Sequence, residues 1–184
     1  IKPTPIISTL GIKKNNDTII KSGFVKNNDL VYLLGAENIN LSEKTLLGSE
    51  YENYFCKSIS GIPPINLEDE KKLHDINRSL IKKKIIKSAN DCSDGGLLST
   101  IIEKCFLGNT GFKFTTEIDE SLLIPSFFGE INSRIVVSID TEDEKKLMKE
   151  LESAKLPYLK IGEVINDNNL LINKSLSLDL SFLK

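Results

Sequence analysis

Two aspartates and a pair of glycines stand within one short stretch of the chain, residues 88–97, which read SANDCSDGGL. Ile85 and Ile86 precede it as a β-branched run typical of a buried strand, which would present Asp91 at its carboxyl end. A carboxylate at such a position suits a hard cation that bridges to phosphate oxygens, and α/β sheets bind ligands at this end of their strands. The stretch therefore predicts a site for a magnesium-bound polyphosphate, with Asp91 as the metal ligand.

An amphipathic helix is expected directly after this stretch. Its apolar face repeats with helical spacing and consists of Leu97, Leu98, Ile101, Ile102, Cys105 and Phe106. We expect the helix to start near Ser93 or Asp94, with Ser93 as its N-cap, so that free N–H groups and the helix dipole attract an anion. Gly95 and Gly96 would let a ligand or a neighbouring backbone approach the first turn closely. The candidate nucleotide-binding residues of this run are Ser93, Asp94, Gly95 and Gly96, although Asp, Ser and Gly also form ordinary caps and turns without a ligand.

Strands and helices alternate along the rest of the chain. Apolar runs predict strands at residues 30–34, 134–139 and 159–165, with one more from residue 170. Asn66 is expected to cap a helix with an acidic first turn, and residues 141–144 form a capping box that opens another helix. The polar stretch from Gly35 through Tyr51 is expected to be a loop. This order predicts an α/β fold, layered as in α+β proteins, in which helices pack on a mixed β-sheet.

The composition is that of a globular domain. The 184 residues are 40% hydrophobic and 27% charged, with a formal net charge of −2 and interspersed charges of both signs. We expect no nucleic-acid partner, because the sequence has no basic stripe. We expect no membrane association, because no apolar run approaches the ~20 residues of a membrane span. The protein is expected to be cytoplasmic, since no signal peptide is visible.

The cysteines and the histidine add no catalytic constellation. Cys56, Cys92 and Cys105 are odd in number and lack zinc spacing, which suggests a reducing compartment. Cys105 falls on the apolar helix face and is expected in the core, whereas Cys92 has no base nearby in sequence that would activate it. The single histidine, His74, falls within a helical pattern and is expected on the helix surface. We therefore assign no catalytic residue.

Six short runs occur in an order that resembles a known family. They are residues 3–7 (PTPII) with Gly11, 48–51 (GSEY), 61–64 (GIPP), 90–97 (NDCSDGGL), 130–134 (EINSR) and 161–163 (IGE). Over its whole length the chain resembles the C-terminal part of the phosphoribosylformylglycinamidine synthases, whose synthetase belongs to the aminoimidazole ribonucleotide synthetase superfamily. The resemblance implies the C-terminal domain type of that superfamily.

The resemblance implies an ATP-dependent C–N ligase of purine biosynthesis. This family converts formylglycinamide ribonucleotide, ATP and ammonia from glutamine into formylglycinamidine ribonucleotide, ADP and phosphate. Its synthetase is built as two similar halves, each with an N-type and a C-type domain. Residues 13–184 resemble the second C-type domain, and residues 1–12 the tail of the preceding N-type domain or a linker strand. The implied partners are the remaining synthetase domains, a glutaminase partner or domain, and a small-molecule nucleotide substrate.

The motif match also implies roles for individual residues. Asp91 would supply a ligand for Mg2+ in an auxiliary ATP or ADP site, and the isolated chain is expected to fold without ligase activity. Arg134 is a further candidate cofactor-binding residue, which would pair with Glu130 or with a phosphate. Glu50 and Tyr51 are expected to serve the turn and its packing.

Some positions depart from the family pattern. Asn90 stands where the family usually has histidine, Cys92 where valine or arginine is common, and Leu47 replaces the first glycine of the turn before Glu50. Two alternatives therefore stay open. One is a C-type domain of another superfamily member, namely aminoimidazole ribonucleotide synthetase, selenophosphate synthetase or thiamine-monophosphate kinase. The other is a purely structural domain that binds no ligand.

Overall fold

One mixed sheet organises the molecule. The computed structural model describes residues 7–12, 14, 18–57, 61, 63, 65–173 and 176–183. The strands of this part of the chain are β1 Leu30–Leu34, β2 Ile86–Asp91, β3 Gly111–Phe114, β4 Ile135–Ile139, β5 Tyr158–Ile165, β6 Asn169–Ile172 and β7 Leu176–Asp179. Their order across the sheet is β2-β4-β1-β5-β3-β6-β7, with β3 and β6 parallel and the other neighbours antiparallel. The predicted α/β fold with a mixed sheet is confirmed.

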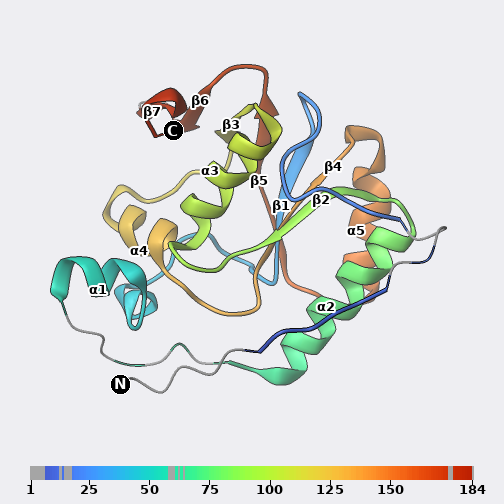
Figure 1. Cartoon of the computed structure of the whole chain (residues 1–184), viewed down its shortest axis with the longest axis horizontal. Coiled ribbons are helices and arrows are strands. Elements are labelled where there is room, and N and C mark those ends of the chain that lie inside the picture. Colours follow the sequence, from blue (N-terminus) through green and yellow to red (C-terminus); the bar gives the residue numbers. More distant parts are fainter. Residues whose placement is uncertain are drawn as a thin grey trace.

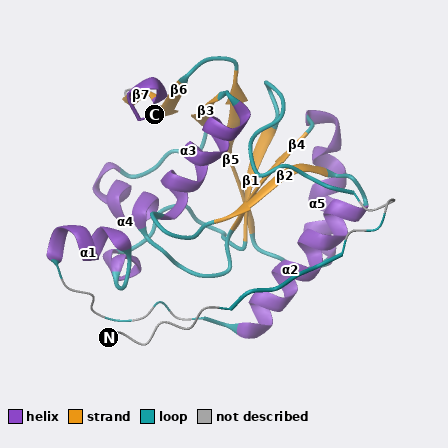
Figure 2. Ribbon diagram, in the orientation of Figure 1, coloured by secondary structure: helices purple, strands orange, loops and turns teal. Residues whose placement is uncertain are grey.

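Helices cover both faces of this sheet. The helices are α1 Glu50–Cys56, α2 Leu67–Lys82, α3 Gly96–Gly108, α4 Leu123–Phe128 and α5 Glu144–Ser153, with short 3-10 turns at Glu43–Leu46, Glu120–Leu122, Thr141–Asp143 and Leu180–Leu183. In Figure 1, α3 and α4 lie on one side of the strands and α2 and α5 on the other. Figure 2 shows the central strands between these two helical layers. No helix among the described residues is long and apolar enough to cross a membrane.

The central strand β1 shows how the sequence builds these layers. All five of its residues are buried, as expected for a strand covered on both faces. Val31 and Leu33 belong to the hydrophobic cluster that contains the apolar face of α3, while Leu30, Tyr32 and Leu34 belong to the cluster of α2 and α5. The period of two therefore divides one apolar run between two cores.

Pairing on β4 places the ends of β1 and β2 together. Ile135, the first residue of β4, lies opposite Leu34 on one side and opposite Asp91 on the other. Ile139, at the other end of β4, pairs with Leu30 and Ile86. Asp91 is thus at the carboxyl end of its strand, as predicted from residues 85–91.

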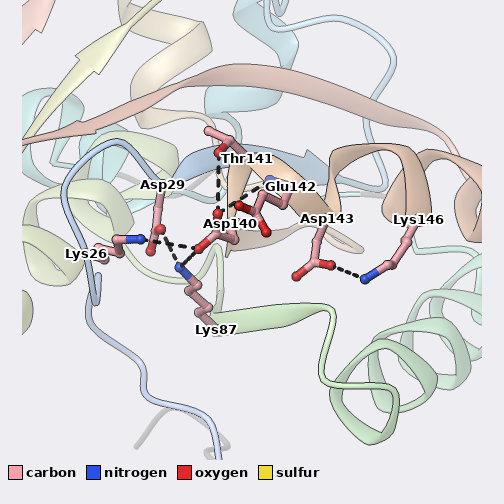
Figure 3. A network of polar contacts seen from close by, with 8 residues as sticks. All are labelled: Lys26, Asp29, Lys87, Asp140, Thr141, Glu142, Asp143 and Lys146. Atoms are coloured by element: carbon pink, nitrogen blue, oxygen red, sulfur yellow. Dashed lines mark hydrogen bonds and ion pairs between the residues drawn. The ribbon is translucent and has the colours of Figure 1, made fainter.

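An ion-pair network ties the opposite end of the sheet together (Figure 3). The Lys87 ammonium lies 2.7 Å from Asp29 Oδ1 and 2.8 Å from Asp140 Oδ2, and Lys26 approaches Asp140 at 3.5 Å. Burial raises the pKa of Asp29, whereas the hydrogen bond from Lys87 holds the pKa of Asp140 below its usual range. The network joins the segment before β1 to the start of β2 and the end of β4.

Several local predictions need correction. Strand β3 and helix α4 were not predicted, because runs this short carry little periodic signal. The stretch from Gly35 through Tyr51, expected to be a loop, contains a 3-10 turn and the start of α1. The tail from residue 170 forms two strands instead of one. The expected capping box at residues 141–144 is instead a 3-10 turn capped by Asp140, whose side chain accepts a hydrogen bond from the Glu142 amide.

The segment before the sheet is described only in part. The strand expected around residues 3–7 lies outside the described residues up to residue 6. Residues 7–12 are exposed and form neither helix nor strand. The division into residues 1–12 and 13–184 therefore stays a prediction.

The start of α3 differs from the prediction and explains the glycine pair. The helix begins at Gly96 with Gly95 as its N-cap, and Ser93 does not cap it. Gly95 and Gly96 have φ angles of 77° and 69°, a left-handed conformation that other residues rarely adopt. A Cβ on Gly96 would lie 2.6 Å from the carbonyl oxygen of Phe127. The two glycines were expected to allow the close approach of either a ligand or a neighbouring backbone. At Gly96, the structure shows the approach of a neighbouring backbone.

Lys104 is a fully buried lysine within α3. Its ammonium donates to the Ser22 carbonyl at 2.7 Å and to Ser88 Oγ at 3.0 Å, and it lies 5.1 Å from the centre of the Phe24 ring. The side chain is 0% exposed, and burial lowers the pKa of Lys104 to about 7. Its neutral form is therefore accessible near neutral pH.

We predict that Lys104→Met removes a pH dependence of stability. Between pH values of about 7 and 10.5 the unfolded chain keeps the lysine proton and the folded protein releases it, so the free energy of unfolding rises with pH. Methionine binds no proton, so the variant should lack this rise, while Lys113→Met at an exposed lysine should keep it. Urea unfolding at about pH 6.5 and about pH 8.5 measures the difference. Equal pH slopes in the two variants would contradict the prediction.

We also predict that Gly96→Ala destabilises the fold. The left-handed conformation costs an L-residue about 1–2 kcal/mol, and the contact with the Phe127 carbonyl adds to it, so the free energy of unfolding should fall by about 2 kcal/mol or more. Gly11→Ala is the matched control, because a Cβ added at Gly11 would meet no atom within 4 Å. Urea midpoints that agree between the two variants would show that the backbone approach at Gly96 is not restrictive.

Candidate functional site

A pocket of about 850 Å3 opens at the end of the sheet where β2 ends and β4 begins. Its wall comes from α2, the end of β2, the turn that follows it and the segment leading into β4. The lining residues are Gly48, Pro63, Glu70, Leu73, His74, Asn77, Ala89, Asn90, Asp91, Cys92, Ser93, Asp94, Glu130, Ile131, Asn132, Ser133, Arg134 and Ile135. Asp91, Ser93, Asp94 and Arg134 of the predicted site therefore share one pocket, and Gly95 and Gly96 are not part of its wall.

Asp91 presents an exposed carboxylate at this pocket. Its Oδ2 accepts a hydrogen bond from Ser93 Oγ, and Asp94 is also exposed. Ser93 therefore orients the carboxylate of Asp91 instead of capping α3. This arrangement leaves the carboxylate accessible to a ligand from the pocket side.

Glu130 lines the pocket, although the sequence suggested it only as a partner for Arg134. Its Oε1 accepts hydrogen bonds from the Gly95 amide at 2.8 Å and from the Glu50 amide at 2.9 Å. The Gly96 amide donates to the Ser93 carbonyl at 3.0 Å. The amide groups of both glycines are therefore already paired within the chain, and the expectation that they are free to bind phosphate is wrong. The run at residues 130–134 drew attention to Glu130, but no local signal shows which amides its carboxylate reaches.

Arg134 supports the turn that carries Glu130. Its Nη2 donates to the Gly129 carbonyl at 2.6 Å and its Nε to the Ile131 carbonyl at 3.4 Å. The residue is 4% exposed, and burial lowers the pKa of its guanidinium. The expected pairing of Arg134 with Glu130 is wrong, because the nearer backbone carbonyls take its hydrogen bonds. A contact between Arg134 and a phosphate stays a prediction.

Helix α2 supplies the opposite wall. The His74 imidazole lies 2.9 Å from Glu70 Oε1, and Ser133 Oγ donates to Glu70 Oε2. The His74 side chain is 58% exposed, which confirms its predicted place on the helix surface. Glu70, Asp91, Asp94 and Glu130 make the pocket wall predominantly acidic.

The acidic residues do not form a metal cage of their own. Over the described residues, no group of three or more His, Cys, Asp or Glu side chains is placed to hold a metal ion. Mg2+ is commonly held by one or two carboxylates together with phosphate oxygens and waters. The accessible carboxylate of Asp91 fits a magnesium ion that shares its coordination with a ligand.

Cysteine chemistry does not contribute to the pocket. Burial raises the pKa of the Cys92 thiol, which keeps it protonated and weakly nucleophilic. Cys105 is buried in the core as predicted.

The GSEY run at residues 48–51 is also explained by structure. Ser49 is the N-cap of α1, and its side chain accepts a hydrogen bond from the Glu52 amide. The Tyr51 ring packs on Phe55 and Phe128, with centroid distances of 4.6 and 5.5 Å. The expected packing role of Tyr51 is confirmed, but Glu50 and Tyr51 begin a helix and do not form a free-standing turn.

Comparison with solved structures shows the same fold. Thermotoga maritima PurL complexed with FGAR superimposes with a TM-score of 0.69 at 17% identity, covering 91% of this chain and 30% of that one. T. maritima PurL complexed with ATP gives a TM-score of 0.69 at 16% identity, covering 91% of this chain and 27% of that one. At this identity the likeness concerns the fold.

Comparison of sequences shows the family. Phosphoribosylformylglycinamidine synthase subunit PurL of Prochlorococcus marinus subsp. pastoris is 36% identical over 153 residues, which are 83% of this chain and 19% of the relative. The chain spans about a fifth of the length of the curated relatives it matches. Residues 26–172 match the family described as AIR synthase related protein, C-terminal domain. The chain therefore belongs to the AIR synthase related family, as its C-terminal domain, in agreement with the resemblance of its sequence.

Proposed function

We propose that this chain acts as a domain of a phosphoribosylformylglycinamidine synthase and contributes a site for magnesium-bound ATP or ADP. The assignment to this ligase is supported by the Prochlorococcus marinus relative, which is a phosphoribosylformylglycinamidine synthase subunit. The T. maritima PurL protein, which has a similar fold, was solved with FGAR and with ATP. The observation that carries the site is the accessible carboxylate of Asp91 at the carboxyl end of β2, inside the pocket.

The proposed reaction is that of the whole ligase. Formylglycinamide ribonucleotide, ATP and ammonia from glutamine would give formylglycinamidine ribonucleotide, ADP and phosphate. Bound Mg2+ would offset negative charge on the phosphate oxygens. In this chain, Asp91 would bind the cation, Ser93 would orient the Asp91 carboxylate, and Glu130 would hold the turn that follows them.

The proposed enzyme also contains further synthetase domains and a glutaminase partner or domain. Tyr54 and Phe55 on α1 are 76% and 64% exposed, which supports coverage of this surface by other synthetase domains. A glutaminase partner or domain would supply the ammonia, and free cysteines support a reducing, cytoplasmic location.

A structural domain without a ligand is the second candidate. The observation in its favour is that Glu130 already occupies the amides of Gly95 and Glu50, which a phosphate would otherwise use. In this candidate Asp91 binds no ligand, whereas in the first candidate it binds the cation.

We predict that Asp91→Asn weakens the binding of Mg-ADP by about tenfold or more, because the amide lacks the charge that binds the cation. Asp167→Asn is the matched control, since Asp167 accepts a hydrogen bond from the Asn169 amide and does not line the pocket. Titration calorimetry of both variants and the wild type in the presence of Mg2+ measures the change. Unchanged affinity in Asp91→Asn would favour the structural candidate.

We also predict that the 184-residue chain by itself does not catalyse the ligase reaction, because it offers no acid–base constellation for the chemical step. The measurement is ADP release from ATP in the presence of formylglycinamide ribonucleotide and ammonia, with T. maritima PurL as the comparison protein. Ammonia-dependent turnover by the chain alone would overturn its assignment as a domain.

A further inference from the structure

We infer that Glu130 determines the form in which the pocket accepts a polyphosphate, excluding the free anion and admitting the cation complex. This inference rests on the proposed nucleotide binding and assigns the residue that sets its selectivity. It follows from the hydrogen bonds of Glu130, from the way its turn is anchored, and from the charge of the pocket wall.

Glu130 occupies the place at which an anion would bind most readily. Helix α3 has 13 residues, and the partial positive charge at its N-terminus attracts anions. The carboxylate of Glu130 already accepts the Gly95 amide there at 2.8 Å, together with the Glu50 amide at 2.9 Å. A phosphate could use these amides only by displacing a carboxylate that belongs to the chain.

The turn around Glu130 is anchored on both sides, which opposes that displacement. Arg134 donates to the carbonyls of Gly129 and Ile131, the two residues that flank Glu130. The Gly129 amide donates to the Pro125 carbonyl at 3.0 Å. Because the backbone on either side is fixed, the Glu130 carboxylate is preorganised against the two amides.

The negative charge of the pocket wall also opposes the binding of a free polyphosphate. Glu70, Asp91 and Asp94 line the pocket together with Glu130, and no lysine is among the described lining residues. The Arg134 guanidinium is buried and bonded to carbonyls. Like charges about 4 Å apart repel by roughly 1 kcal/mol in water and by more near a protein surface. A free polyphosphate is therefore repelled, whereas a divalent cation at Asp91 reverses the sign of the interaction.

The test compares inorganic pyrophosphate binding in EDTA with Mg-ADP binding in Mg2+, both by titration calorimetry. Glu130→Gln keeps the size and one acceptor oxygen but removes the charge, while Glu130→Asp keeps the charge. Glu120→Gln is the matched control, an exposed carboxylate outside this pocket. In EDTA, Glu130→Gln should bind pyrophosphate about five- to tenfold more tightly than the wild type, and the other two variants should show no gain. Thermal unfolding verifies that each variant is folded.

The outcomes separate this inference from the proposed function. Pyrophosphate binding by Glu130→Gln that is no tighter than that of the wild type overturns the inference, as does wild-type binding of pyrophosphate that is equally tight with and without Mg2+. The latter measurement needs no variant and so is independent of any folding defect. Failure of the wild type to bind Mg-ADP overturns the proposed function instead, and a gain of pyrophosphate affinity in Glu130→Gln would still support the role of Glu130.

Discussion

The close approach of two backbone segments holds the site end of the molecule together. The turn at Gly95 and Gly96 lies against the end of α4, so closely that a Cβ on Gly96 would meet the carbonyls of Phe127 and Gly129. Glu130, the next residue along, then reaches the amides of Gly95 and Glu50. One short segment thus joins the N-termini of α1 and α3 and forms part of the pocket wall. Asp91, the last residue of β2, and Ser93 come directly before this glycine turn, so the contact fixes the chain immediately after them.

The two ends of the sheet differ in whether their carboxylates are paired with lysines. At one end, Lys87 forms ion pairs with both Asp29 and Asp140, and Lys26 also approaches Asp140. Asp29 is buried, and its charge is paired there. At the other end, Asp91 and Asp94 are exposed without an ion-pair partner among the described residues. A carboxylate that is paired with a lysine has its charge satisfied within the chain, whereas an accessible and unpaired carboxylate can bind an external cation. This contrast supports the pocket, and not the ion-pair network, as the candidate site.

The acidic pocket wall reduces the number of interactions that would attract a nucleotide. The sequence suggested two attractions, a cation at Asp91 and free amides at the start of a helix. The structure retains an accessible Asp91, but it pairs the amides internally and directs Arg134 toward carbonyls of its own turn. The remaining attraction acts through a cation, which makes the proposed site more dependent on metal than the motif by itself implied.

By itself the sequence determined the fold class, most of the strands, the helices after Asn66 and the apolar face of α3, because period and capping are local properties of neighbouring residues. It also placed Asp91 at the end of a strand. Tertiary structure alone decided that Gly96 faces a carbonyl from α4 and that Glu130 pairs with amides 35 and 80 residues away in the chain. Those contacts depend on how α1, α3 and α4 meet at the end of the sheet. No spacing within a single segment encodes that meeting, so the composition of the pocket wall became known only when the elements were packed.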